Sequence, residues 1–361
     1  MCGRLHRVPL TSRKAGGCIG LYRASRNRMV AVLINGDGIA ASCCSHLLRQ
    51  AGLHPIVERL ARPRLPALML SEATQLLLRD VFGREDLFSG VPRVRSRVVV
   101  WAQDSKARTL PHSAVIIGEQ QLLERIHQGL GESESVQAEQ PNWTIFASTA
   151  PRPPSVEHHF GSRMAAASPV RLNPKSDAEA CWIESFENGW LFLLPTGKGP
   201  GWLLSVGDSV ESLLERSGLI KEQIDEIDPS RGTFPSHPRI VLPLSEPGWL
   251  ACGTAALGFD PLCGEGTGNA VREAILASAI IRAAVEGASV DDLVAHYQTR
   301  RLAGFRRHFD LCIEFYASGR SGPWWDDQVN ELKRGLAWCS QQLRDTPAFR
   351  YRLNGFTLER L

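Results

Sequence analysis

Residues 253–270 read GTAALGFDPLCGEGTGNA, and a helix-like run over residues 271–285 follows them. Gly264, Gly266 and Gly268 occupy alternate positions just before that run. A loop of this composition presents backbone N–H groups to an anion or to an electron-rich ring edge, and the dipole of the following helix adds partial positive charge there. A single glycine-rich loop is a weak indication of a ligand, so its meaning depends on the rest of the chain.

A second glycine motif lies more than 200 residues earlier, within a pattern typical of a nucleotide-binding unit. Residues 28–34 form an apolar run that predicts a buried parallel strand. Gly36, Gly38 and Ala41 follow in a G-x-G-x-x-A spacing, before a helical pattern and a short strand that ends at Glu58. Glu58 lies 22 positions after Gly36, close to the roughly 20 expected of a carboxylate that binds a dinucleotide ribose. Two such loops predict one long cofactor held at both ends; the alternative is an ordinary β-α-β unit whose glycines serve only the turn.

The composition indicates a globular chain and argues against two kinds of partner. Of its 361 residues, 43% are hydrophobic and 22% are charged. No uninterrupted apolar stretch reaches the roughly 18 residues that a membrane helix needs, so no membrane partner is expected. The net charge is +3, but seven of the basic residues and no acidic residue lie in residues 1–28. The other 34 basic and 38 acidic residues give the rest of the chain a net negative charge, which argues against nucleic acid.

The N-terminal residues and the cysteines both favour a cytoplasmic protein. Residues 1–28 show no clear strand or helix pattern and lack the apolar core of a secretory signal. We expect them to form a basic flexible extension; the alternative is that translation starts at Met29. The nine cysteines form no C-x-x-C pair and no zinc-type spacing with histidine, which predicts no metal site and is typical of a reducing compartment. Cys263 lies inside the second glycine loop, where it is either a reactive thiol or a packing residue.

The order of the patterns predicts an α/β chain with a discontinuous cofactor domain. Alternating short runs in the middle third predict an antiparallel meander, and a strand at residues 249–252 then leads into the second loop. Residues 59–118 are ambiguous, because they could contribute to the substrate side. The predicted parts are the extension at 1–28, the cofactor domain at 29–149 and 249–288, an antiparallel substrate domain at 150–248, and a C-terminal helical region at 289–361.

The two glycine motifs resemble those of the FAD-dependent aromatic hydroxylases and of their relatives, the flavin-dependent tryptophan halogenases. Residues 36–41 look like the family's ADP-binding fingerprint. Residues 253–256 and 260–266 look like its G-D-A-A…D-P…G-x-G motif, which wraps the ribityl chain and ring of the flavin. The resemblance covers residues 29–120 and 143–285 and implies a Rossmann-like FAD-binding domain. It implies that FAD is held by Gly36, Gly38, Ala41, Glu58, Gly253, Thr254, Asp260, Pro261, Gly264, Gly266, Thr267 and Gly268.

Three departures from the family pattern bear on the reaction. Thr254 stands where the family has an aspartate that hydrogen-bonds the ribityl chain, a bond that a hydroxyl can still make. Residues 189–195 read GWLFLLP and are similar to the halogenases' W-x-W-x-I-P, with Phe192 in place of the second tryptophan. No lysine lies between Lys14 and Lys106, although halogenases place in that region a lysine thought to carry the halogenating species. The missing lysine favours hydroxylation or another oxidation over halogenation.

The resemblance extends to a sub-branch, the flavoproteins that mature the tryptophylquinone cofactors of bacterial oxidases. It rests on residues 110–113, residues 189–192, residues 260–268 and the Trp-rich helical tail. It implies an FAD-dependent monooxygenase that uses O₂ and hydroxylates an aromatic substrate through a flavin C4a-(hydro)peroxide, the substrate being a tryptophan of a partner polypeptide. The electrons would come from NAD(P)H or from a separate reductase, because the chain has no second dinucleotide fingerprint.

Three residues are candidates for the substrate side, and two other functions stay open. His112 is the candidate acid/base or substrate-orienting group, and Trp190 and Phe192 are candidates for lining the substrate site. The alternative for His112 is a surface or packing histidine, and the alternative for Trp190 and Phe192 is core packing. The tryptophans of residues 323–338 either form a partner surface or fasten the C-terminal helices to the body. The other functions are a flavin-dependent halogenase or another FAD oxidoreductase of this fold, and a non-catalytic nucleotide-binding protein.

Overall fold

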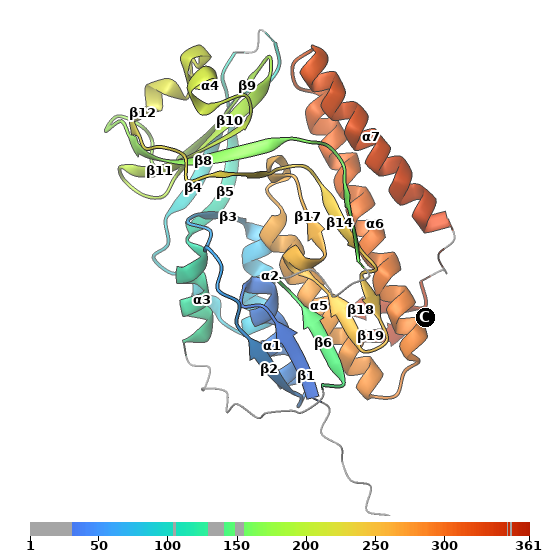
Figure 1. Cartoon of the computed structure of the whole chain (residues 1–361). Helices are drawn as coiled ribbons and strands as arrows, with labels where there is room; N and C mark the ends of the chain where they lie inside the picture. Colours follow the sequence, from blue (N-terminus) through green and yellow to red (C-terminus); the bar gives the residue numbers. More distant parts are fainter. Residues whose placement is uncertain (1–30, 104–105, 129–140, 149–154, 345, 347–348) are drawn as a thin grey trace, which may run out of the picture.

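Two large sheets and a group of long helices make up the α/β fold (Figure 1). The computed structural model describes residues 31–103, 106–128, 141–148, 155–344, 346 and 349–361. The expected extension at residues 1–28 lies outside that part of the chain. Among the helices so described, none combines the length and the apolar character needed to cross a membrane.

The first sheet carries both glycine loops at one edge. β1 pairs in parallel with β2 and with β6, and β6 pairs in parallel with β16. Because the carboxyl ends of parallel strands lie at the same edge of a sheet, the segments that follow β1, β6 and β16 meet there. The strand order is β15-β16-β6-β1-β2, with β1 (Ala31–Asn35), β2 (His54–Glu58), β6 (Trp143–Phe146), β15 (Ser245–Glu246) and β16 (Trp249–Ala251).

Helices α1 and α5 pack against each other beside this sheet. α1 buries Cys43 and Cys44, and the Cys44 thiol lies 3.8 Å from the carbonyl oxygen of Ala274 on α5. α2 begins after Ser71, whose hydroxyl accepts the Thr74 N–H. The helical patterns predicted after Ala41 and after the second glycine loop are confirmed as α1 and α5. The helix bounds are Ile39–Gln50 for α1, Glu72–Phe82 for α2, Glu119–His127 for α3 and Gly266–Val285 for α5.

The second sheet contains the predicted antiparallel meander. Strands β8 to β11 pair antiparallel in the order β8-β11-β10-β9, which confirms that prediction. β3, β4 and β5, from residues 59–118, extend the same sheet. The nine strands are β3 (Leu68–Ser71), β4 (Arg93–Val100), β5 (Arg108–Ile117), β8 (Met164–Leu172), β9 (Ala180–Phe186), β10 (Gly189–Pro195), β11 (Pro200–Gly207), β12 (Ile224–Ile227) and β13 (Thr233–Pro235).

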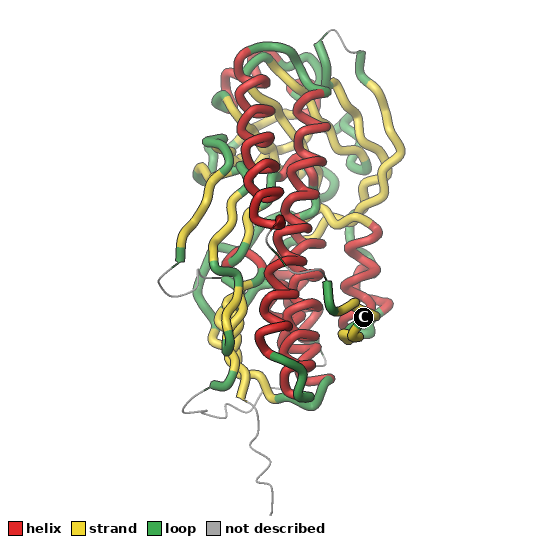
Figure 2. The backbone as a smooth tube through the Cα atoms, turned by 90° about the vertical axis from the view of Figure 1, so that its right-hand side faces the viewer, coloured by secondary structure: helices red, strands yellow, loops and turns green. Residues whose placement is uncertain are grey.

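Two long helices, α6 (Val290–Ala317) and α7 (Pro323–Arg344), run side by side along the molecule (Figure 2). Phe305 and Phe309 of α6 are fully buried, as their helical spacing predicts. Trp325 of α7 is also buried, and its indole N–H donates to the carbonyl of Phe186 on β9 at 2.9 Å. Burial therefore explains Trp325: it fastens α7 to the second sheet.

The structure corrects the prediction in two places. α5 begins at Gly266 rather than near residue 271, so the last glycines of the loop form its first turn. The C-terminal region also ends in a hairpin and is not wholly helical; four alternating residues per strand are too short a pattern to be recognised. The remaining elements are β7 (Val156–His159), β14 (Arg239–Leu242), β17 (Leu257–Gly258), β18 (Tyr351–Asn354), β19 (Thr357–Arg360), α4 (Val210–Arg216) and the 3₁₀ turns η1 (Glu85–Phe88), η2 (Lys221–Gln223), η3 (Gly253–Ala255) and η4 (Pro261–Cys263).

Candidate cofactor site

The first glycine loop makes a tight turn that packs against the segment following β6. Gly36 has a φ of +138°, and a Cβ at this position would lie 2.5 Å from the hydroxyl oxygen of Ser148. Its N–H donates to the carbonyl of Glu58 at 2.9 Å, which fixes the turn to the end of β2. Both the backbone conformation and the lack of space require glycine here.

The N-terminus of α1 fits an anionic group. Gly38 is the N-cap, it provides no side-chain hydrogen bond, and the first turn holds no acidic residue. The N–H groups of that turn and the helix dipole therefore favour a negative charge such as a pyrophosphate. Ala41 is buried and packs inside the fold, which is the role that a small third residue has in this fingerprint.

Two arginines that the sequence analysis missed cover this helix end. Arg64 binds both carboxylate oxygens of Asp37, at 3.1 and 2.6 Å. Arg62 pairs with the buried Glu119, and its Nη2 is 2.6 Å from where a Cβ on Gly38 would lie. Both arginines lie in the Arg- and Pro-rich segment, residues 59–66, that follows β2. Only that composition could have pointed to them, because Glu119 lies 57 positions from Arg62.

Glu58 lies where a ribose-binding carboxylate is expected. It ends β2, opposite Asn35 at the end of β1. The Asn35 side-chain amide donates to the Glu58 carboxylate at 3.2 Å, and Glu58 is exposed. The carboxylate is therefore both positioned and open to a ligand.

The second glycine loop reaches the first. Gly253 has a φ of +57°, and a Cβ there would lie 3.1 Å from both the Ala147 carbonyl oxygen and the Ala40 side chain of α1. Its N–H donates to the buried Glu273 carboxylate of α5, which also pairs with Arg301 of α6. The structure therefore brings together the two loops that the sequence predicted to hold one cofactor.

The first turn of α5 offers a second set of backbone N–H groups. Gly264 and Gly266 are exposed, and Thr267 is half-buried. The N-cap residue is Glu265, whose side chain makes no capping hydrogen bond and pairs with Arg272 at 3.0 Å, and the first turn itself holds no acidic residue. This end fits an electron-rich ring edge. Gly268 differs from the prediction, because it is buried and a Cβ there would lie 2.7 Å from the Thr74 hydroxyl oxygen of α2. Its position serves helix packing.

Thr254, the residue in place of the family's aspartate, lies at the surface. The residue is exposed, and its carbonyl oxygen accepts a hydrogen bond from Arg239 at 2.6 Å. Thr254 is therefore accessible to a ligand.

Asp260 and Pro261 shape the loop instead of presenting side chains to a ligand. The Asp260 carboxylate is fully buried and pairs with the equally buried Arg163 guanidinium at 2.7 Å. It also accepts the Tyr316 hydroxyl at 3.1 Å and caps η4 through the Leu262 N–H at 2.9 Å. Pro261 is the first residue of that turn. The sequence could not show this, because Arg163 lies 97 positions from Asp260.

The similarities of this chain to known proteins lie in its fold. No family model matches the sequence, and no curated protein matches it significantly. The flavin-dependent halogenase CmlS aligns with a TM-score of 0.67 and 18% identity, over 90% of this chain and 74% of that one. QhpG, a peptidyl tryptophan dihydroxylase essential for tryptophylquinone cofactor biogenesis, aligns with a TM-score of 0.68 and 16% identity, over 91% and 86% of the two chains. The chain has the fold of the flavin-dependent halogenases and monooxygenases.

A third structure supports the same assignment of fold. The probable FAD-dependent monooxygenase pqsL from Pseudomonas aeruginosa aligns with this chain with a TM-score of 0.61 and 15% identity, over 86% of this chain and 99% of that one. The resemblance inferred from the two glycine motifs is thereby confirmed for the fold. The residues at the meeting point of the two loops also fit FAD, since they combine uncapped helix ends, a ribose-type carboxylate and glycines without space for a side chain.

The three candidates for the substrate side share one face of the second sheet. Phe192 pairs with Ile183, and the register of β9, β4 and β5 places His112 on the same face. Phe192 and His112 are half-buried. Trp190 differs from the prediction, because it is fully buried and its indole N–H lies 3.4 Å from the Tyr316 hydroxyl oxygen. Trp190 is a core residue.

The contact with Arg97 fixes the tautomer of His112 and leaves its Nδ1–H free to donate a hydrogen bond. Its Nε2 lies 3.3 Å from a guanidinium nitrogen of Arg97, and a guanidinium can only donate. Burial, and then the charge of Arg97, lower the pKa of His112. The neutral ring that results accepts from Arg97 at Nε2 and therefore carries its hydrogen on Nδ1. This arrangement suits orientation of a polar group better than removal of a proton.

Proposed function

We propose that this protein is an FAD-dependent monooxygenase that hydroxylates an aromatic substrate. The observation that carries the proposal is the meeting of the two glycine loops at one edge of the first sheet, with Gly253 packed on Ala40 and Gly36 beneath Ser148. The fold shared with flavin-dependent halogenases and monooxygenases supports it. When bound and reduced, FAD would supply the two electrons that activate O₂, and O₂ would be the source of the transferred oxygen atom, its other oxygen leaving as water.

Different residues of the site would bind different parts of FAD. The first turn of α1, with Arg62 and Arg64 beside it, would bind the pyrophosphate. Glu58 would bind the ribose. The N–H groups at the start of α5 would stabilise negative charge on the flavin ring.

His112 and Phe192 are our candidates for the substrate. Phe192 would offer an aromatic wall, since it is half-buried and packs against the main hydrophobic core. The Nδ1–H of His112 would donate a hydrogen bond that orients the substrate, while Arg97 keeps the ring in that tautomer. Positioning is the main contribution that the protein's own groups make to such a reaction.

We propose a tryptophan side chain of a partner polypeptide as the substrate. QhpG, whose fold this chain shares, is a peptidyl tryptophan dihydroxylase. Halogenation is the second candidate, since CmlS shares the fold as well. The absence of any lysine between Lys14 and Lys106 favours hydroxylation.

A product assay tests the proposal. The purified chain is loaded with FAD and incubated with O₂ and either NAD(P)H or a flavin reductase. Chloride and bromide are present throughout, and the substrate is a tryptophan-bearing quinoprotein subunit or, in parallel, free tryptophan. We expect one or two oxygen atoms to be added to the tryptophan of the subunit, seen by mass spectrometry. A halogen isotope pattern would show the second candidate. Flavin bound to the purified chain would eliminate the non-catalytic alternative, and a chain that binds no flavin would overturn the proposal.

Replacing Glu58 by glutamine is expected to weaken FAD binding without abolishing it. The amide keeps the shape of the side chain but loses the charge, so the affinity should fall about threefold to tenfold. Equilibrium titration followed by flavin fluorescence measures the change. Glu222→Gln, at an exposed site in η2, is the matched control and should leave the affinity unchanged. Equal affinities for the two variants would show that Glu58 does not contact the ribose.

A further inference from the structure

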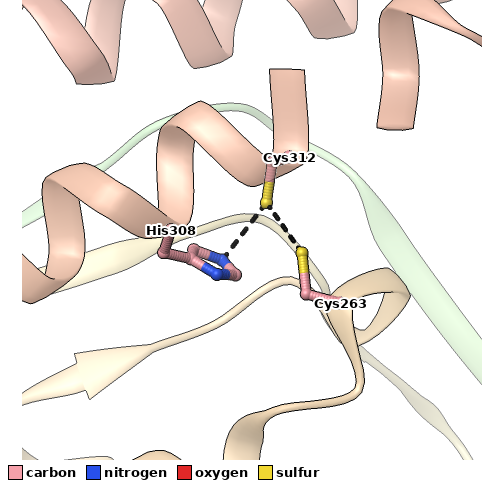
Figure 3. Close-up of side chains that lie close together, drawn as sticks. All are labelled: Cys263, His308 and Cys312. Carbon is pink, nitrogen blue, oxygen red and sulfur yellow. Dashed lines mark hydrogen bonds between the residues drawn. The ribbon is translucent and has the colours of Figure 1, made fainter. Parts of the chain in front are cut away.

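Cys263, His308 and Cys312 form a cluster that the proposed function does not use (Figure 3). Cys263 ends η4 in the second glycine loop, and the other two residues lie one turn apart on α6. The Cys263 and Cys312 sulfur atoms are 3.4 Å apart, and the Cys312 sulfur is 3.3 Å from Nε2 of His308. This geometry allows either a metal ion or a bond between the two sulfurs.

The hydrogen bonds of His308 argue against a metal ion. The backbone N–H of Asp260 donates to Nε2 of His308 at 3.0 Å, so the lone pair that would bind a metal already accepts a hydrogen bond. Tetrahedral zinc, with Zn–S bonds of about 2.3 Å, would also hold two thiolates about 3.8 Å apart. The observed sulfur separation is shorter than that. The cluster is therefore built for two sulfurs and a hydrogen-bonding imidazole.

The two sulfurs differ in access, and open space lies beside the loop that carries Cys263. Cys263 is half-buried, whereas Cys312 is fully buried. Gly264 follows Cys263 with a φ of +64°, and nothing lies within 4 Å of where its Cβ would be. Closing a sulfur separation of 3.4 Å to a bond of about 2.05 Å requires a small shift of this loop towards α6. An oxidant that enters from solvent would meet Cys263 first.

We propose that Cys263 and Cys312 form a reversible disulfide, with hydrogen peroxide as the oxidant and Cys263 as the sulfur that reacts first. The Cys263 thiolate attacks one peroxide oxygen, the O–O bond breaks, and the released hydroxide takes up a proton to become water. The sulfur of Cys312 then attacks the sulfenic acid sulfur of Cys263, and the S–O bond breaks. The thiol proton leaves with that oxygen as a second water. Two thiols are oxidised and one peroxide is reduced.

The groups that face the two sulfurs assign the same roles. The hydrogen bond from Cys312 is the largest of the effects that lower the pKa of Cys263 to about 7, and His308 adds to it. Burial and the charge of Asp260 oppose this shift. Burial and the bond to Cys263 raise the pKa of Cys312 well above its usual value, although Arg163 opposes this. Cys263 is therefore the thiolate and Cys312 the proton donor.

The disulfide would tie the second glycine loop to α6. The loop residues from Pro261 to Gly264 lead directly into the first turn of α5, which is part of the proposed flavin site. Oxidation would therefore restrict that site. This consequence rests on the proposed function, whereas the disulfide itself does not require bound flavin.

A second pair of cysteines provides an internal control. Cys44 and Cys252 also share a thiol hydrogen bond, but both are fully buried. That hydrogen bond, burial and neighbouring charges raise the pKa of Cys252 well above its usual value. Peroxide should therefore leave this pair reduced.

Peptide mapping of the purified full-length chain tests the disulfide. After treatment with hydrogen peroxide and blocking of free thiols, we expect a Cys263–Cys312 cross-linked peptide that has lost two hydrogen atoms and that dithiothreitol reverses. Cys312→Ser should instead accumulate a sulfenic acid at Cys263, trapped by dimedone. A cross-link confined to Cys44 and Cys252, reduced thiols throughout, or stoichiometric zinc that protects Cys263 would each overturn the proposal.

The pH dependence of alkylation in the unmodified chain needs no variant. The initial rate of reaction of Cys263 with iodoacetamide should rise with pH around a midpoint near 7, because the thiolate is the reactive form. His308→Asn should move the midpoint upward, since His308 lowers the pKa of Cys263. A midpoint at the usual pKa of a cysteine in the unmodified chain would overturn the assignment of Cys263 as the reactive sulfur.

Discussion

Replacing Gly36 by valine is expected to remove FAD from the protein. A side chain at this position meets the Ser148 hydroxyl oxygen at 2.5 Å and the Ser148 backbone nitrogen at 3.0 Å. The φ of +138° is also one that a β-branched residue avoids. The loop would have to move away from the segment after β6, and the N-terminus of α1 would lose its alignment with the second glycine loop. Strain of about 2–3 kcal/mol in the binding conformation corresponds to an affinity loss of about a hundredfold.

Equilibrium binding of FAD, with circular dichroism to confirm folding, measures this effect. Gly52→Val is the matched control, because Gly52 also has a left-handed φ, of +76°, but its Cβ would meet nothing within 4 Å. Gly52 lies beyond the other end of α1, so this variant should carry backbone strain and still bind FAD normally. Equal flavin contents of Gly36→Val and the unmodified chain would show that the first loop does not hold the cofactor.

The meeting of the two loops could be predicted because strand topology decides it. Parallel strands deliver their carboxyl ends to one edge of a sheet, so a glycine turn after β1 and another after β16 must lie close once both strands join that sheet. The two turns can be predicted locally, because the spacing of the glycines indicates them. The likeness of the motifs to those of flavoproteins then gave the fold, which the structure neighbours confirm.

Partners at long sequence distance could not be predicted. Glu119 and Arg62 are 57 positions apart, and Cys263 and Cys312 are 49 positions apart. No local pattern links such residues, because their contact depends on how the elements pack. The motif predicts a cofactor contact for Asp260 for the same reason: its buried partner Arg163 lies 97 positions away, outside any pattern around Asp260.

Replacing Asp260 by asparagine is expected to lower the free energy of unfolding by about 3–5 kcal/mol, because it leaves the Arg163 charge buried without its partner. Asparagine keeps the size of the side chain and can still accept the Leu262 N–H that caps η4. The loss therefore reports the charge and not the shape of the loop. Urea denaturation of the flavin-free protein measures it.

Glu226→Gln is the matched control, since Glu226 pairs with Arg171 at a site where both side chains are more than half exposed. Solvent screens that pair, so its loss should cost less than about 1 kcal/mol. The flavin-free measurement separates two roles for Asp260. If it holds the loop to the body, stability falls before any cofactor is added. If it contacts FAD directly, as the resemblance of the sequence implies, the flavin-free stability stays unchanged and only the affinity falls. The buried pair with Arg163 and the Tyr316 hydrogen bond favour the first result.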